Sequence, residues 1–315
     1  MQRLAAIGEC MVELRHRDAG VMELGFAGDS FNTALYLARC TPPSRLAIDY
    51  VTALGTDPYS AAMREFWHSE GIGSAAVAHL PDRLPGLYLI RTDEDGERQF
   101  FYYRSAAAAR ELFRNDAGDR LLAALADYDV LYFTAITLSI LAPEARERLH
   151  VALGAARRAG RLVIFDSNYR PAGWASPEAA RAAIAPFLDQ VSLALPTFED
   201  ERALWGDATP AETVARYRSR GIEVAVKCGG EACLLGDGGA VPVPARLAPV
   251  DTTAAGDAFN AAYIAARLDG RSPVEAAYSG HILAGTVIQH RGAIMPRDIV
   301  IPGFPAYRPR QANPG

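Results

Sequence analysis

The sequence has little cysteine and no long apolar run, and both absences narrow its class. Its four cysteines show neither CxxC spacing nor histidine partners at zinc-finger spacing, so we expect free thiols in a reducing cytoplasm. The longest apolar stretch, 130–142, is too short and too interrupted by threonine and serine to cross a bilayer. No charged segment followed by a long apolar one precedes Leu4, so we expect a cytoplasmic protein without a secretory signal.

Excess charge and lysine are also scarce. A formal net charge of −5 argues against general binding to nucleic acid or to an anionic membrane. Lys227 is the only lysine among 32 basic residues. Either it meets phosphate as a compact point charge, which a guanidinium fork does not replace, or it is retained by chance. Half of the 315 residues are hydrophobic, which allows one large α/β domain with an appendage, or two domains.

The most informative stretch is 250–259, which reads V-D-T-T-A-A-G-D-A-F. We expect a strand over 248–250, then small residues, then a helix over 258–268. This layout exposes backbone N–H groups at a helix N-terminus, where an anion is favoured. A carboxylate, Asp257, beside such a cradle indicates a base that takes a proton from a hydroxyl during phosphoryl transfer. From these residues alone, Asp257 is equally well interpreted as a helix cap.

Beyond residue 127 the pattern alternates between short apolar strands and helices, as in a doubly wound sheet whose ligands bind beyond the carboxyl ends of the strands. Polar segments at 166–170, 196–197 and 227–230 follow three expected strands, and we expect 251–257 to follow a fourth. The expected strands are 129–133, 161–165, 193–195 and 224–227, and the expected helices are 143–159, 177–187, 199–205, 210–220 and 273–289.

The first hundred residues contain two hairpins that do not fit this alternation. The first joins strands over 11–15 and 21–26, and the second joins 86–91 and 99–104 about an Asp-Gly turn at 92–97. We expect the two hairpins to pair into a small sheet, a lid over the ligand.

One face of the second hairpin carries aromatic and basic side chains. Tyr102 and Arg104 are two residues apart and share one side of their strand, which Tyr88 of the partner strand can join. Such a face suits an acidic, hydroxylated ligand, because guanidinium holds a carboxylate with two hydrogen bonds. The alternative is a solvated outer face with the tyrosines packed against the lid.

Two motifs of other nucleotide-binding folds are absent. The spacing of a P-loop does not occur, which disfavours a P-loop NTPase. No G-x-G-x-x-G follows the first strand, which disfavours a dinucleotide oxidoreductase.

The motifs that are present resemble those of the ribokinase-like (PfkB) carbohydrate kinases. D-T-T-A-A-G-D at 251–257, followed by F-N-A-A, is similar to the C-terminal signature of that family, in which the second Asp is the catalytic base and the A-A-G-D amides form the anion hole. R-G-A-x-x-P at 291–296 resembles its closing loop, which walls the adenine and in some members a monovalent-cation site. The strings most similar to 2-keto-3-deoxygluconate kinases within the family are G-D-S-F-N-T-A at 28–34, F-Y-Y-R-S-A-A-A at 101–108, D-S-N-Y-R at 166–170 and P-T-F-E-D-E-x-A-L-W-G at 196–206.

This resemblance implies a ribokinase-like doubly wound α/β sheet flanked by helices, with a small β-sheet lid. The implied α/β domain covers 1–12, 27–84 and 105–302, the lid covers 13–26 and 85–104, and 303–315 form a poorly ordered tail. The implied reaction is ATP-dependent phosphorylation of 2-keto-3-deoxygluconate to 2-keto-3-deoxy-6-phosphogluconate, with Mg²⁺ and, in some members, a monovalent cation. The implied partners are a sugar acid, ATP and a second copy of the chain, paired through the lid.

The resemblance also assigns residues. The catalytic group is Asp257 with the amides of Ala254, Ala255 and Gly256. The substrate contacts are Gly28, Asp29, Asn32, Tyr88, Tyr102, Arg104, Asn168, Arg170 and Asp257. The nucleotide contacts are Asn168, Arg170, Thr197, Lys227, Gly229, Gly230 and Gly256.

The chain departs from the family pattern at two places, and two other functions stay open. Asp29 stands where the general pattern has a second glycine, and Thr197 and Asp200 replace the N-x-x-E pair that assists Mg-ATP binding, so no metal ligand is assigned. The alternatives are a kinase of this fold for a neutral sugar, such as fructose or ribose, or for a nucleoside, and a non-catalytic sensor of sugar acids. His281 either stacks on the base or lies on a helix surface.

Overall fold

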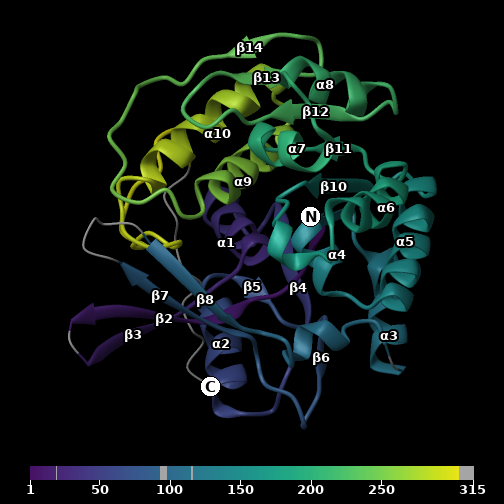
Figure 1. The fold of residues 1–315 in the computed structure, drawn as a ribbon, viewed down its shortest axis with the longest axis vertical. Helices are drawn as coiled ribbons and strands as arrows, with labels where there is room; N and C mark the ends of the chain where they lie inside the picture. The colour runs from purple at the N-terminus through teal and green to yellow at the C-terminus, as the bar shows by residue number, and fades with distance from the viewer. Residues whose placement is uncertain (19, 93–97, 115, 305–315) are drawn as a thin grey trace.

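The computed structural model describes residues 1–18, 20–92, 98–114 and 116–304. These residues form a large central sheet between two layers of helices, and a smaller sheet beside it (Figure 1). Residues 93–97 of the predicted Asp-Gly turn and residues 305–315 of the predicted tail lie outside the described residues. No helix within the described ranges is long and apolar enough to cross a membrane.

The central sheet is parallel except at one edge. Its strand order is β14-β13-β12-β11-β10-β9-β1-β4-β5, with β6 also paired to β4, and the last two strands at the β14 edge are antiparallel. The bounds are β1 Gln2–Ile7, β4 Leu46–Leu54, β5 Ile72–Gly73, β6 Val77–His79, β9 Val130–Thr134, β10 Leu162–Asp166, β11 Leu193–Ala194, β12 Glu223–Val226, β13 Cys233–Leu235 and β14 Ala240–Val241.

Two layers of helices cover the sheet because its inner strands are apolar on both faces. Every residue of β9, for example, is buried. One face packs against α1 (Asp29–Cys40), α2 (Pro58–Ser69), α9 (Ala255–Leu268) and α10 (Pro273–Val287). The other packs against α3 (Asp116–Ala124), α4 (Ala135–Ile140), α5 (Pro143–Arg158), α6 (Pro177–Leu188), α7 (Phe198–Trp205) and α8 (Pro210–Arg218).

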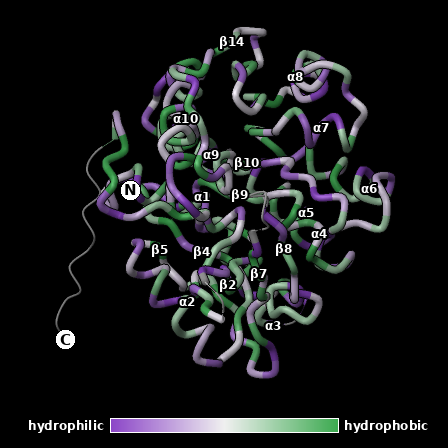
Figure 2. Tube along the Cα trace, turned by 60° about the vertical axis from the view of Figure 1, so that its left-hand side comes forward, coloured by the Kyte–Doolittle hydropathy of each residue, from purple (hydrophilic) through white to green (hydrophobic). Residues whose placement is uncertain are grey.

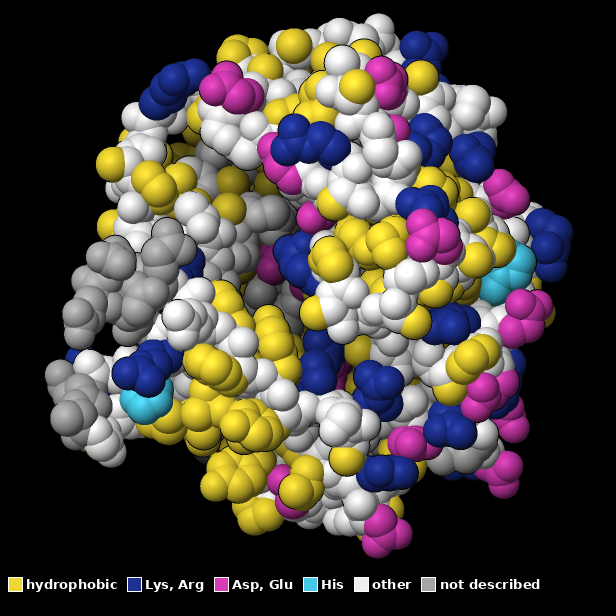
Figure 3. Space-filling view, viewed as in Figure 1, with side chains coloured by type: hydrophobic (Ala, Val, Ile, Leu, Met, Phe, Trp, Pro, Cys, Tyr) yellow, Lys and Arg dark blue, Asp and Glu magenta, His cyan; other side chains and the backbone are white. Residues whose placement is uncertain are grey.

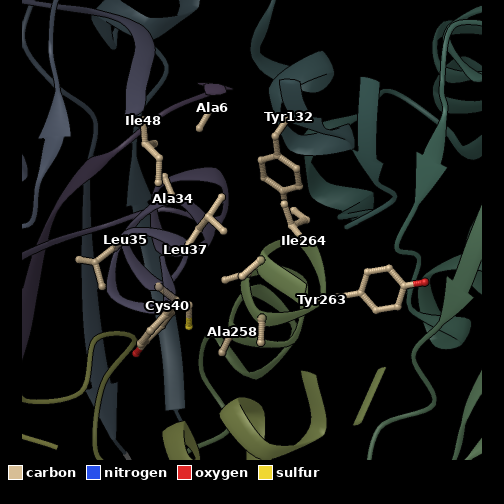
Figure 4. Packing of buried hydrophobic residues seen from close by; sticks show 14 of the residues in the cluster. Ala6, Ala34, Leu35, Leu37, Cys40, Ile48, Tyr132, Ala258, Tyr263 and Ile264 are labelled. Carbon is tan, nitrogen blue, oxygen red and sulfur yellow. The ribbon is translucent and has the colours of Figure 1, made fainter. Parts of the chain in front are cut away.

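The first of these two cores brings together distant parts of the chain. Ala6 and Tyr132 project from the sheet toward α1 and α9, and Leu37 and Ile264 fill the space between those helices (Figure 4). Hydrophobic residues accordingly concentrate along the interior strands, and hydrophilic ones along the outer loops (Figure 2). Packing between residues so far apart in sequence fixes the start of α9 against α1, and this junction holds the functional site.

The smaller sheet confirms the predicted pairing of two hairpins. Its order is β3-β2-β7-β8, with β2 and β7 parallel at the centre and antiparallel pairs on either side. The bounds are β2 Met11–Asp18, β3 Val21–Ala27, β7 Leu87–Thr92 and β8 Arg98–Tyr103. The fold class is therefore as predicted, and the domain limits within the chain stay a prediction.

One predicted strand is wrong. Residues 248–250 form no strand, and 251–257 therefore do not follow a strand end. Pro242, Pro244 and Pro249 explain this, because proline cannot donate a hydrogen bond to a sheet ladder. The segment between β14 and α9 is instead a loop, and α9 begins at Ala255, three residues earlier than predicted.

Candidate active site

The N-terminus of α9 contains the predicted anion cradle. Ala254 is the N-cap residue and has a left-handed backbone with φ of 61°, a strained conformation for a residue with a Cβ. The amide of Ala255 donates to the carbonyl oxygen of Thr252 at 3.3 Å. Gly256 occupies the second helical position, where an amide has no carbonyl partner within its own helix. Of the three predicted amides, that of Gly256 is therefore best suited to receive an anion.

Asp257 lies in the first turn of α9 and is buried. Its Oδ2 atom accepts a hydrogen bond of 2.9 Å from Nδ2 of Asn32 in α1. The helix is capped at Ala254 without a side-chain bond, so Asp257 is not its cap residue. Burial raises the pKa of Asp257 to about 8; the nearby Asp29 adds to the rise, and Asn32 opposes it. A carboxylate with such a pKa is a competent proton acceptor near neutral pH.

Lys227 supplies a buried positive charge beside this helix start. Its Nζ atom donates to Oδ1 of Asn260 at 2.9 Å and lies 3.3 Å from both carboxylate oxygens of Asp166. Nδ2 of Asn260 donates to Asp166 at 2.7 Å, which closes a three-residue network. A Cβ atom added to Gly256 would lie 3.6 Å from Nζ of Lys227, so the ammonium group adjoins the cradle.

A cavity of about 500 Å³ opens next to the cradle, within the size range of small-molecule sites. It lies between the 227–231 turn, the loop at 243–249 and the faces of α9 and α10. Five of the predicted nucleotide contacts line it: Thr197, Lys227, Gly229, Gly230 and Gly256. Small residues and an ammonium group at its inner end fit a nucleotide with its phosphates directed toward Asp257.

His281 also lines this cavity, so of its two predicted alternatives the position on a helix surface is wrong. The side chain is buried, Nε2 donates to the carbonyl oxygen of Val241 at 3.0 Å, and the ring meets Phe259 edge to face. Burial lowers its pKa, so the ring is neutral at physiological pH. The loop that replaces the predicted strand at 248–250 covers this face of α10, which could not be foreseen from the sequence.

A second group of predicted residues lies on the other side of Asp257. Oδ2 of Asp29 accepts hydrogen bonds from Oγ1 of Thr134 at 2.6 Å and from Nδ2 of Asn168 at 3.0 Å. Burial raises the pKa of Asp29. Gly28 donates to Oδ1 of Asn32 at 3.4 Å, which joins the helix start of α1 to the residue that holds Asp257. Asn168, predicted for both ligands, lies with this group and does not line the cavity.

The lid presents its predicted side chains to this region. Tyr88 and Tyr102 are paired across β7 and β8 with ring centroids 5.7 Å apart, and the Arg104 guanidinium lies 6.0 Å from the Tyr102 ring. Burial raises the pKa of the Tyr102 hydroxyl, whereas Arg104 and Arg170 lower it, so both guanidinium groups act on it. Figure 3 shows a hollow between the lid and the α/β body, with basic and acidic side chains at its edges.

Arg170 is an exposed residue of this group, with a side chain that is 57% accessible. Its Nη1 atom donates to Oδ1 of Asp200 at 3.1 Å and to the carbonyl oxygen of Tyr169 at 2.8 Å. Burial raises the pKa of Asp200, and its ion pair with Arg170 opposes the rise. No group of three or more acidic, histidine or cysteine side chains with metal-binding geometry occurs in the described part of the chain.

Sequence reasoning missed several side chains that hold this site together. Arg98 of β8 contacts Asp251 and Thr253, which ties the lid to the loop before α9. Asp251 also accepts hydrogen bonds from the amides of Thr253 and Gly292, at 2.7 and 2.8 Å. The other missed residues are Glu9, Glu13, Thr134 and Asn260. Glu9 and Thr134 lie at the carboxyl ends of β1 and β9, where the rule for parallel sheets could have found them.

A buried base and an anion cradle that meet at the inner end of a nucleotide-sized cavity define a phosphotransferase for small molecules. Comparison with known proteins gives the same class. Residues 1–299 match the model of the pfkB family carbohydrate kinases, and the chain belongs to this family. It is 44% identical over 304 residues to 2-dehydro-3-deoxygluconokinase of Escherichia coli K12, with 94% of this chain and 98% of the relative covered.

Solved structures share the fold. A 2-dehydro-3-deoxygluconokinase from Thermotoga maritima has a TM-score of 0.80 at 20% identity and covers 94% of this chain and 96% of its own. A putative ribokinase II from E. coli in complex with ATP and Mg²⁺ also has a TM-score of 0.80, at 21% identity, and covers 93% of this chain and 94% of its own. At these identities the likeness concerns the fold alone.

Proposed function

We propose that this carbohydrate kinase transfers the γ-phosphoryl group of ATP to the 6-hydroxyl of 2-keto-3-deoxygluconate, also named 2-dehydro-3-deoxygluconate. The observation that carries the proposal is the position of Asp257. Its buried carboxylate lies between the cavity lined by Lys227 and the group formed by Asp29 and Asn168. The 44% identity to curated kinases with this substrate supports the choice of sugar.

The chain's own groups divide the work of the reaction. Asp257 takes the proton of the attacking hydroxyl, with Asn32 fixing the orientation of its carboxylate. The Gly256 amide and the Lys227 ammonium offset the charge that develops on the transferred group. Bound ATP supplies that group. Because the described residues offer no cage of acidic ligands, Mg²⁺ would be held largely by the ATP phosphates and water, which is common for this ion.

The lid selects the sugar by charge in this proposal. The Arg104 guanidinium lies 6.0 Å from the Tyr102 ring, and the charges of Arg104 and Arg170 both lower the pKa of the Tyr102 hydroxyl, so two guanidinium groups are available for an acidic sugar. A carboxylate on the ligand would bind them through charge-assisted hydrogen bonds. Gly28, Asp29, Asn32 and Asn168 supply the polar contacts for the hydroxyl groups at the other end.

The test is an ADP-release assay with a panel of acidic and neutral sugars. We expect the wild type to prefer keto-deoxy sugar acids, and Asp257→Asn to lower kcat by about 100- to 10,000-fold, as the loss of a general base does. Turnover by Asp257→Asn equal to that of the wild type would sink the assignment. Wild-type binding of the sugar acid without ADP release would instead identify a non-catalytic sensor.

One observation favours a second candidate, a kinase for a neutral sugar. Relatives that are 28% identical include fructokinase-1 of Zea mays, with 67% of this chain covered. Arg104→Ala separates the two, since it should impair the use of acidic sugars strongly and that of neutral sugars little.

The proposal includes three features predicted from the family resemblance. ATP as the phosphoryl donor fits a cytoplasmic location. A monovalent cation beside the loop at 291–296 would make ADP release faster in potassium than in choline buffer. Pairing of two copies through the lid is supported by the apolar outer face of the small sheet, where Leu24 and Phe101 are both 47% exposed.

A further inference from the structure

Glu9 is a buried acid in contact with the proposed sugar-binding arginine. It follows β1 at the carboxyl edge of the central sheet, and its side chain is 1% exposed. We propose that Glu9 is a positioning residue that fixes the Arg104 guanidinium for the carboxylate of the substrate, and so contributes to the selection of acidic sugars. This inference rests on the proposed function, in which Arg104 binds that carboxylate.

The contact between the two side chains is enclosed. Oε2 of Glu9 forms an ion pair with Nη2 of Arg104. Both carboxylate oxygens, and the Nε and Nη2 atoms of Arg104, are inaccessible to solvent. The guanidinium therefore directs Nη2 toward Glu9, and Nη1 does not belong to this enclosed set, which leaves Nη1 for a ligand. Because the guanidinium is planar and rigid, fixing Nη2 also restricts the direction of Nη1.

Two glycines provide the space for this pair. A Cβ atom on Gly86, just before β7, would lie 2.5 Å from Oε1 of Glu9 and 3.3 Å from Cβ of Arg104. A Cβ atom on Gly28, just before α1, would overlap with the carbonyl oxygen of Glu9. The lid backbone at Gly86 thus approaches the Glu9 carboxylate closely, and the start of α1 approaches the Glu9 backbone, so both glycines restrict where this residue can lie.

A similar arrangement occurs four residues further along the chain, at Glu13 in β2. Oε2 of Glu13, also buried, accepts a hydrogen bond from the Tyr88 hydroxyl. Two lid side chains assigned to the substrate are therefore each held by a glutamate from the 9–13 segment. Burial raises the pKa of both glutamates, and the contacts with Arg104 and Tyr88 oppose that rise. Buried acids at both positions are costly without such partners, which argues for a role beyond packing.

The experiment is a double-mutant cycle with Glu9→Gln and Arg104→Gln, measured by ADP release with 2-keto-3-deoxygluconate. We expect Glu9→Gln to raise the KM for the sugar acid about tenfold, with kcat within twofold of the wild type and the KM for ATP unchanged. In the Arg104→Gln background, Glu9→Gln should change the sugar KM by less than twofold, because no guanidinium is left to position. Glu223→Gln is the control, since it weakens another Glu–Arg pair, with Arg267. Glu223 is the first residue of β12 and lies at the end of that strand away from Lys227.

The outcomes separate this inference from the proposed function. A wild type that releases ADP equally well with acidic and with neutral sugars would overturn the proposed function itself. A wild type that selects acids, combined with an unchanged sugar KM in Glu9→Gln, would overturn the role of Glu9 alone, as would effects that multiply in the double variant. If Glu9→Gln unfolds, as thermal denaturation would show, Glu9→Asp takes its place in the cycle with the same expected directions, because it keeps the charge but withdraws the carboxylate from Arg104.

Discussion

At the scale of single residues, the raised pKa of Asp257 sets the pH dependence of the reaction. A base works only when deprotonated, and burial raises the pKa of this carboxyl to about 8. We therefore expect kcat/KM for the sugar to rise about tenfold per pH unit below pH 8 and to level off above it. The measurement is the pH profile of ADP release between pH 6 and 9.5.

Asp29 provides the control for this profile. Its charge is one of the causes that raise the pKa of Asp257, so Asp29→Asn should move the rising limb to lower pH, whatever it does to the maximal rate. A wild-type profile that is flat from pH 6 to pH 9 would contradict the assignment of Asp257 as the base.

Lys227 supports the site through a buried ion pair, and its removal should cost stability as well as rate. Lys227→Gln leaves Asp166 buried without its cation, a loss of about 3–5 kcal/mol in the free energy of unfolding. The double variant Lys227→Gln/Asp166→Asn should recover much of that loss, because no unpaired charge remains. Urea denaturation of the wild type and both variants measures the difference; equal midpoints for the two variants would exclude a stabilising pair.

A residue's place in the site could be predicted from the sequence where it belongs to a motif of consecutive positions. Asp257, Gly256 and Lys227 could be singled out because their neighbours along the chain indicate what surrounds them. Glu9 and Asp166 could not be paired with Arg104 and Lys227, because 95 and 61 residues separate the partners and only packing of the sheet brings them together. The scarcity of lysine indicated Lys227 but not its network with Asp166 and Asn260.

At the scale of elements, the first turn of α9 both starts a helix and binds an anion. A substitution of Gly256 should affect these two roles in opposite directions. Gly256→Ala adds a Cβ that meets Lys227 only at ordinary contact distance, and alanine favours a helix over glycine by about 0.5–1 kcal/mol. We expect the variant to be as stable as the wild type or more so, yet slower by tenfold or more, because the new methyl group narrows the cradle beside the ammonium. Thermal denaturation and ADP release measure the two effects.

The outcome that would contradict this prediction is a variant with unchanged kcat and unchanged KM for ATP. A matched control is Gly285→Ala in α10, where the nearest neighbour of a new Cβ is Cδ1 of Leu247 at 3.5 Å, across the cavity from the phosphate end. It should affect the KM for ATP more than kcat.

Elements were predictable wherever a period or a turn signal was strong. The two hairpins of the lid and the alternation after residue 127 follow from such patterns. Within the loop at 242–254, Ala248 and Val250 predict a strand, whereas three prolines in the same segment favour the loop that forms. The short strands β5, β6, β13 and β14 carry too few residues to show a period, and they form through pairing with longer neighbours.

At the scale of the whole molecule, one face of the lid is buried at Tyr88 and Ile90, whereas the other face leaves Leu24 and Phe101 each 47% exposed. One row across the sheet is apolar from edge to edge, since Leu24 pairs with Leu14, Leu14 with Leu89 and Leu89 with Phe101. The opposite face contains Tyr88 and Tyr102 and looks toward the proposed sugar site. A sheet face of this kind, at a distance from the nucleotide cavity, is well suited to meet a second copy of itself.

We therefore expect a dimer that dissociates when a charge is placed in this row. Phe101→Glu or Leu24→Glu should reduce the mass in solution from twice 33.9 kDa to 33.9 kDa, measured by size-exclusion chromatography with light scattering. Val151→Glu, at an exposed apolar position on α5, is the control and should leave the mass unchanged. Because the row lies on the side of the lid away from the sugar, the KM for ATP should stay the same in every variant, while the sugar KM should rise if pairing steadies the lid. A wild type of 33.9 kDa at micromolar concentration would rule out this interface, and would leave the lid held by contacts within one chain, such as those of Arg98 with Asp251 and Thr253.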